Sequence, residues 1–127
     1  MRVLLAEDEA LIALSLADLL EAEGYDVAIA ADGIEALRQA RRLESGFDVL
    51  MTDLNMPFMA GEDLIRALRA ERPDLPVIVV TGSAPAGGAE ALRCYGGGHG
   101  PLALLHKPID HTALLDALRH TVSSRDC

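Results

Sequence analysis

Short apolar runs alternate with helical apolar patterns along the chain. The runs occupy residues 2–6, 25–30, 47–52, 76–81 and 102–106. Runs without alternating polar positions are typical of strands buried on both faces of a sheet. Between them, apolar residues recur every three or four positions, which predicts helices over 9–23, from Ile34 to Leu43, over 61–71 and after Asp110 as the cap. This alternation predicts a doubly wound α/β fold, a five-stranded parallel sheet with helices on both faces.

The stretch 82–101 departs from this pattern. It is rich in glycine and contains Pro85 and Pro101, so only Ala89 to Tyr95 could form a helix. Glycine costs about 1 kcal/mol per helical position relative to alanine. We therefore expect the fourth helix to be short or disordered and this stretch to be the least stable part of the fold.

Length and composition indicate one globular domain over residues 1–127 that acts in the cytoplasm. Half of the residues are hydrophobic and 24% are charged, which is ordinary for a folded protein. No apolar stretch approaches the roughly 18 residues of a membrane span. The net charge of −9 disfavours nucleic acid and anionic membranes as partners, since both are negatively charged. We expect Cys94 and Cys127 to be free thiols in a reducing compartment.

Unusual polar residues follow the predicted strands, at the edge where open parallel sheets bind ligands. Glu7 and Asp8 follow the first strand, Asp53 the third, Thr81 ends the fourth and Lys107 follows the fifth. The first loop has carboxylates where a nucleotide-binding sheet has a glycine-rich phosphate cradle. Carboxylates suit Mg²⁺, and Lys107, the only lysine of the chain, could balance these acids. Alternatively, Glu7-Asp8-Glu9 is an acidic helix start.

Four motifs give the chain a family resemblance. They are Glu7-Asp8, Asp53-Leu-Asn-Met-Pro-Phe-Met-Ala-Gly61, Val80-Thr81-Gly82 and Lys107-Pro108. In this order, each at a strand end, they resemble the receiver domain of two-component response regulators, over essentially the whole chain. The resemblance implies the flavodoxin-like (βα)5 receiver fold. The chain stops soon after its last helix, so we expect the stand-alone type of receiver.

The resemblance also implies a phosphoryl-transfer site at Asp53. Asp53 would be the phosphoacceptor, taking the phosphoryl group from a phosphohistidine of a sensor histidine kinase or histidine phosphotransfer protein. Asp8, Asp53 and the backbone carbonyl of Asn55 would bind Mg²⁺, with Glu7 acting through a water molecule. The domain would catalyse its own phosphorylation and dephosphorylation, but it would serve mainly as a signalling switch toward a downstream target protein that the sequence does not name.

The resemblance assigns two further residues to the phosphoryl group and shows one departure. The Thr81 hydroxyl and the Lys107 ammonium would contact its oxygens, and a cis bond between Lys107 and Pro108 would aim the lysine. Leu104 stands where the family commonly has an aromatic switch residue, three positions before the lysine. The usual coupling between the phosphorylated site and the partner surface therefore needs another route.

Other interpretations remain open at this stage. The chain could be a receiver-like scaffold that binds proteins without being phosphorylated. A flavin-binding protein of the flavodoxin type is disfavoured, because the chain has no phosphate cradle and few aromatic residues. The apolar residues Met56, Phe58 and Met59 are either part of a kinase-docking surface or a packed loop. In the first helix we expect Leu11, Leu14 and Leu16 to lie in the core.

Overall fold

The computed structural model describes residues 2–42, 46–82, 101–107 and 109–123. Within these ranges five strands and four helices follow one another along the chain. Their bounds are β1 Arg2–Ala6, α1 Ala10–Ala22, β2 Asp26–Ala30, α2 Gly33–Arg42, β3 Val49–Thr52, α3 Gly61–Glu71, β4 Val77–Thr81, β5 Leu102–His106 and α5 His111–Ser123. The strands and helices expected from the apolar pattern are confirmed, with ends that differ by one or two residues. The expected short helix near 89–95 lies outside the described residues.

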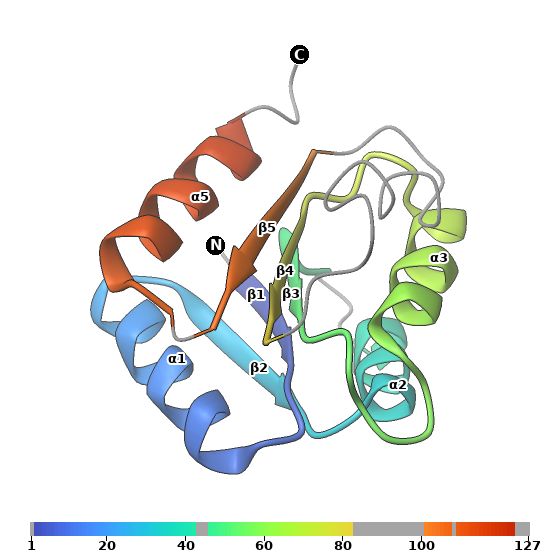
Figure 1. Cartoon of the computed structure of the whole chain (residues 1–127). Helices are drawn as coiled ribbons and strands as arrows, with labels where there is room; N and C mark the ends of the chain where they lie inside the picture. Colours follow the sequence, from blue (N-terminus) through green and yellow to red (C-terminus); the bar gives the residue numbers. More distant parts are fainter. Residues whose placement is uncertain (1, 43–45, 83–100, 108, 124–127) are drawn as a thin grey trace.

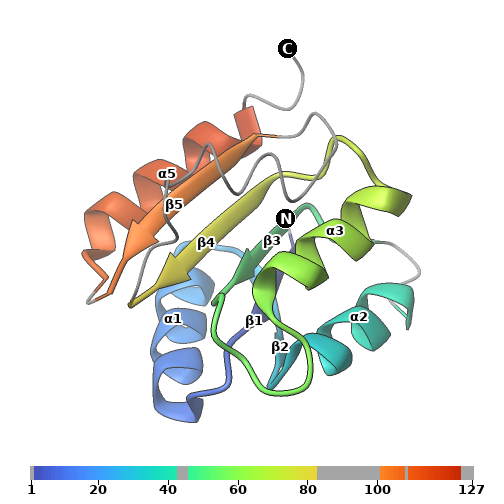
Figure 2. The ribbon, with the colours of Figure 1, turned by 45° about the vertical axis from the view of Figure 1, so that its right-hand side comes forward.

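The sheet has the order β2-β1-β3-β4-β5, and every neighbouring pair is parallel. Helices α1 and α5 cover one face, and α2 and α3 cover the other (Figures 1 and 2). All strands point the same way, so their carboxyl ends form one edge of the sheet, at the bottom of Figure 1. The doubly wound parallel fold expected from the sequence is confirmed.

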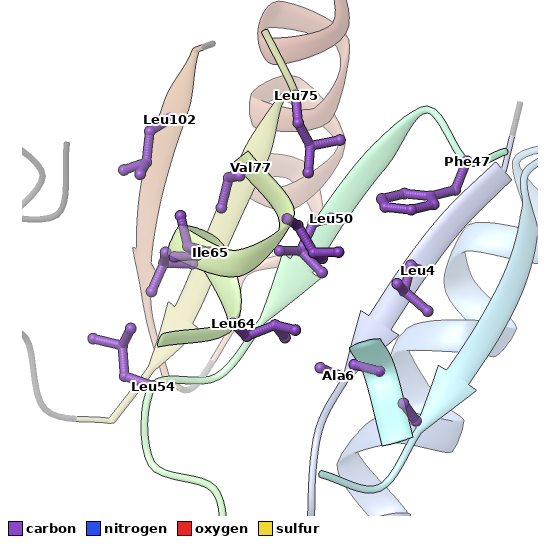
Figure 3. Close-up of a cluster of buried hydrophobic side chains, with 14 residues drawn as sticks. Leu4, Ala6, Phe47, Leu50, Leu54, Leu64, Ile65, Leu75, Val77 and Leu102 are labelled. Atoms are coloured by element: carbon purple, nitrogen blue, oxygen red, sulfur yellow. The ribbon is translucent and has the colours of Figure 1, made fainter. Parts of the chain in front are cut away.

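Two apolar clusters, one on each face of the sheet, hold the layers together. Side chains of α2, α3 and one face of the strands form the first cluster, part of which is drawn in Figure 3. The second joins α1 and α5 to the other face of the strands. Every residue of β3 and β4 is buried, as expected of central strands covered on both sides. Burial of this kind stabilises the fold by about 25 cal/mol for each Å² of apolar surface removed from water.

Aspartates cap two of the helices. Asp32 Oδ1 accepts a hydrogen bond of 2.8 Å from the Glu35 N–H at the start of α2. Asp110 Oδ2 accepts one of 3.0 Å from the Ala113 N–H at the start of α5, which confirms the expected cap. Such bonds satisfy amide donors that a helix leaves unpaired in its first turn, and each is worth about 1 kcal/mol.

The expectation that Leu11 and Leu14 lie in the core is wrong. Leu11 is 82% exposed and Leu14 is also exposed, whereas Leu16 is buried. The buried side of α1 includes the alanines Ala13 and Ala17. Helix α1 carries apolar residues on almost every side, so their spacing could not show which side packs against the sheet.

None of the helices in the described ranges is long and apolar enough to cross a membrane.

Candidate functional site

The residues singled out by the sequence lie at the carboxyl edge of the sheet. Backbone hydrogen bonds continue the strand ladders by one residue there. The Asp53 N–H donates to the Ala6 carbonyl at 3.1 Å, and the Lys107 N–H donates to the Thr81 carbonyl at 2.9 Å. These residues therefore keep the strand register just beyond the strand ends, and the sheet itself brings them together.

Lys107 is at the centre of the site. Its Nζ lies 2.8 Å from Glu7 Oε1 and 2.8 Å from Asp53 Oδ2. Glu7 is 3% exposed and Asp53 is 6% exposed, so both carboxylates have lost most of their contact with water. Burying a charge is costly unless an opposite charge pairs with it. The ammonium group of Lys107 therefore pairs with both carboxylates that the fold has buried side by side and offsets one of their two negative charges.

Burial and charge pairing shift the pKa values of two groups here. Burial raises the pKa of Glu7 above its ordinary value, and hydrogen bonds from Lys107 and the Glu9 N–H oppose this shift only in part. Burial alone would lower the pKa of Lys107, but its hydrogen bonds and charge interactions with Asp53 and Glu7 outweigh burial and raise that pKa. Lys107 is therefore firmly cationic at neutral pH.

Three carboxylates form a cluster that could hold a divalent cation. Oxygen atoms of Glu7, Asp8 and Asp53 all lie within 4.8 Å of one another. Asp8 is exposed, whereas the other two are buried, so one side of the cluster faces water. Mg²⁺ prefers carboxylate and carbonyl oxygens and retains part of its hydration shell. The donor set and its open side fit this ion, because Lys107 offsets only part of the negative charge.

The loop between β3 and α3 fixes the Asp53 carboxylate. The Asn55 N–H donates to Asp53 Oδ1 at 3.1 Å, while Lys107 holds Oδ2. At the start of α3, the Gly61 N–H donates to the Leu54 carbonyl at 3.0 Å. A Cβ at Gly61 would lie 2.8 Å from Leu54 Cα and would overlap the Asp53 carbonyl oxygen. Only glycine lets α3 begin this close to the site's backbone.

The remaining expected residues take less central positions. Thr81 is fully buried at the end of β4, in register with His106 of β5. Asn55 is exposed, and Leu104 packs, partly buried, against the cluster beneath α2 and α3. The expected cis bond between Lys107 and Pro108 lies outside the described residues.

Sequence reasoning missed the role of Gly61. One signal could have revealed it. Glycine is among the least favourable residues in a helix, yet it occupies the first position of the helix expected over 61–71. An unfavourable residue at such a place indicates a close backbone approach.

Comparison with known proteins shows similarity to response regulators and their receiver domains. The family model for the response regulator receiver domain matches residues 3–119. Response regulator receiver protein Anae109_2439 of Anaeromyxobacter sp. strain Fw109-5 is 38% identical over 115 residues, which are 91% of this chain and 46% of that protein. Sensory transduction protein RegX3 of Mycolicibacterium smegmatis is 44% identical over 79 residues, 62% of this chain and 33% of that protein. The chain thus spans less than half the length of these curated relatives.

Solved structures resemble the whole fold. A response regulator receiver domain protein from Clostridium thermocellum superimposes with a TM-score of 0.86 at 27% identity, covering 98% of this chain and 96% of that one. A CheY-like receiver domain protein from Methanospirillum hungatei gives a TM-score of 0.85 at 28% identity, covering 98% and 95%. The likeness therefore extends over nearly all of both chains.

Proposed function

Because the chain belongs to the response regulator receiver domain family, we propose that it accepts a phosphoryl group on Asp53 in a Mg²⁺-dependent reaction. The donor is a phosphohistidine of a sensor kinase or of a phosphotransfer protein, and phosphorylation switches a protein-interaction surface. The observation that carries the proposal is the geometry of Lys107, whose Nζ lies 2.8 Å from Asp53 Oδ2 beside two further acids.

The chemistry follows from the charges at the site. An oxygen of the Asp53 carboxylate attacks the phosphorus atom, and the bond between phosphorus and the imidazole nitrogen breaks. The nitrogen keeps the electron pair, and an acyl phosphate remains on Asp53. Both reactants are anionic, so positioning and charge neutralisation provide most of the catalysis. The Lys107 ammonium is placed to contact one phosphoryl oxygen.

Four residues would hold the ion. Asp8 and Asp53 would bind it through carboxylate oxygens, Asn55 through its backbone carbonyl, and Glu7 through a water molecule. When bound, Mg²⁺ supplies positive charge between the acids and the transferring group. The burial of Glu7 and its ion pair with Lys107 support a role in placing these charges rather than in direct ligation.

Thr81 connects phosphorylation to the rest of the fold in this proposal. An aspartyl phosphate adds about 1.5 to 2 negative charges at one point, and the Thr81 hydroxyl would turn to meet it. The Thr81 carbonyl already accepts the Lys107 N–H, so a shift at the end of β4 would also move the end of β5. Leu104, on β5, would respond by repacking, since it has no aromatic ring to swing.

The setting of the reaction is also part of the proposal. Proteins of this family interact with sensor kinases and phosphotransfer partners, and we propose that this chain does so in the cytoplasm. Its downstream partner is a protein, recognised through the surface that phosphorylation alters.

Labelling with a small phosphodonor tests the proposed function directly. The protein is incubated with Mg²⁺ and phosphoramidate and weighed by intact mass spectrometry. We expect a gain of one phosphoryl mass that EDTA prevents. The matched control Asp53→Asn keeps the size of the side chain but removes the nucleophilic carboxylate, so it should gain nothing. No gain in the unsubstituted protein, under conditions that label another receiver domain, would favour the phosphorylation-independent scaffold.

A further inference from the structure

The loop between β3 and α3 contains an unusual turn at Phe58. Phe58 has a φ of 70°, and the Met59 N–H donates to the Pro57 carbonyl at 2.8 Å. A hydrogen bond across three residues with positive φ at the middle one is a γ-turn of the rare, strained kind. Glycine and asparagine adopt positive φ much more easily than a bulky residue does. The loop thus carries a phenyl ring at a position where the backbone disfavours one.

The phenyl ring contributes nothing to the core that would explain this strain. Phe58 is 83% exposed, whereas its neighbours Met56 and Met59 pack against the cluster beneath α2 and α3. Met59 also lies so close to Gly33 that a Cβ there would come within 2.6 Å of the Met59 carbonyl oxygen. The two methionines are therefore the packed part of the loop, and the ring of Phe58 faces water.

Phe58 is also part of a wider distribution of exposed apolar side chains. The large hydrophobic residues exposed within the described ranges are Leu11, Leu14, Ile34 and Phe58. Leu11 and Leu14 lie in the first five residues of α1, and Ile34 is the second residue of α2. Both helices begin at the carboxyl edge of the sheet (Figure 1). Exposed apolar side chains thus lie on α1, on α2 and on the loop before α3, and a protein bound at the edge that holds Asp53 could bury them.

We propose that Phe58 is a contact residue for the protein that donates the phosphoryl group, an inference that rests on the proposed function. Asp53 is buried and lies five residues before Phe58, so a donor protein must cover this edge to bring its phosphohistidine to the carboxylate. A downstream target seated on Phe58 would instead obstruct access to the site. The donor should present an apolar surface beside its phosphohistidine, with basic residues near the exposed acids Asp8 and Glu9.

The test compares a protein donor with a small one. Phosphorylation rates are measured with an autophosphorylated sensor kinase, chosen from a panel as the one fastest on the unsubstituted chain, and with phosphoramidate. Phe58→Gly and Phe58→Asn remove the ring and relieve the turn, so neither threatens folding. Phe58→Tyr is the matched control, because it keeps an aromatic ring on the same backbone. The readout is the ratio of the kinase rate to the phosphoramidate rate.

Each outcome has a distinct meaning. We expect the ratio to fall about tenfold in Phe58→Gly and Phe58→Asn and to stay near the original value in Phe58→Tyr, with no loss of thermal midpoint. An unchanged ratio, or equal losses with both donors, would overturn the inference. Labelling by phosphoramidate with no transfer from any kinase would also overturn it. If no donor of either kind labels the unsubstituted chain, the proposed function itself fails.

Discussion

Replacing Lys107 by methionine should expose the cost of burying two carboxylates together. The substitution keeps an unbranched side chain that is one atom shorter and removes the ammonium group that lies 2.8 Å from both acids. Oxygens of Glu7 and Asp53 no more than 4.8 Å apart repel each other by about 3 to 4 kcal/mol at an effective dielectric constant of about 20. Breaking a buried pair by removing one partner typically costs about 3 to 5 kcal/mol. We expect Lys107→Met to lose about 3 kcal/mol of stability at pH 8.

The loss should depend on pH with a definite sign. Burial already raises the pKa of Glu7, and removing the Lys107 hydrogen bond raises it further. As pH falls through this raised pKa toward the ordinary value of 4.5, the folded variant takes up a proton before the unfolded chain does. Protonation relieves the repulsion, so the deficit of Lys107→Met relative to the unsubstituted protein should shrink as pH falls and be greatest at neutral to alkaline pH.

Urea unfolding followed by circular dichroism measures this effect, since the chain has no tryptophan to report by fluorescence. The double variant Glu7→Gln with Lys107→Met should recover most of the loss, because one carboxylate is gone. Arg38→Met is a matched control, since its ion pair with Glu35 is also 2.8 Å long but largely exposed; it should change stability by less than about 0.5 kcal/mol. A loss below about 1 kcal/mol at pH 8 for Lys107→Met, or one that does not vary with pH, would refute the reasoning.

Three further predictions concern the surroundings of the site. Gly61→Ala should destabilise the fold by about 2 kcal/mol or more and slow labelling by phosphoramidate, because the new methyl group overlaps the Asp53 carbonyl oxygen; unchanged unfolding curves would contradict this. Arg69→Met should cost about 2 kcal/mol in urea unfolding, since the buried guanidinium donates to the carbonyls of Leu75 and Pro101 at 3.0 Å each; without it the Leu75 carbonyl loses its donor, whereas the Pro101 carbonyl keeps the Val77 N–H. Mg²⁺ should raise the urea midpoint progressively with concentration, as any ligand of the folded state does; a midpoint that ignores Mg²⁺ would argue against the acidic cluster as its site.

The sequence was sufficient to predict most of the fold, because its central strands are strongly apolar. β3 and β4 are short, wholly buried and apolar up to the threonine that ends each of them, and such runs have few alternatives to the centre of a parallel sheet. Strand order then places Glu7, Asp53 and Lys107 at one edge. The candidate site could be predicted for the same reason, since parallel strands bring their carboxyl ends together wherever those ends lie in the sequence.

The sequence could not show which way certain side chains point, although it did show which elements carry them. The side of α1 that packs could not be read from a helix that is apolar on almost every side, and Leu11 was misplaced as a result. The loop residues Met56 and Phe58 are both apolar, yet one packs inward and the other faces water. The difference arises from the positive φ at Phe58, a backbone choice that no pattern of apolar residues encodes.

The placement of Lys107 at the end of β5 affects when, during folding, the proposed phosphoryl-accepting site becomes complete. The lysine stands at the end of β5, an edge strand that pairs in the described sheet with β4 alone, and it meets an Asp53 that lies 54 residues earlier in the chain. Contacts of such long sequence separation form slowly, because the intervening chain must first be ordered. If β5 were not docked, Glu7 and Asp53 would lack the ammonium group that pairs with them. Their mutual repulsion would be unopposed, and the phosphoryl group would have no lysine to contact. The ion pair between Lys107 and Asp53 thus makes the proposed phosphoryl transfer depend on the docking of β5, so a chain that has not yet docked this strand would lack the cation of its site.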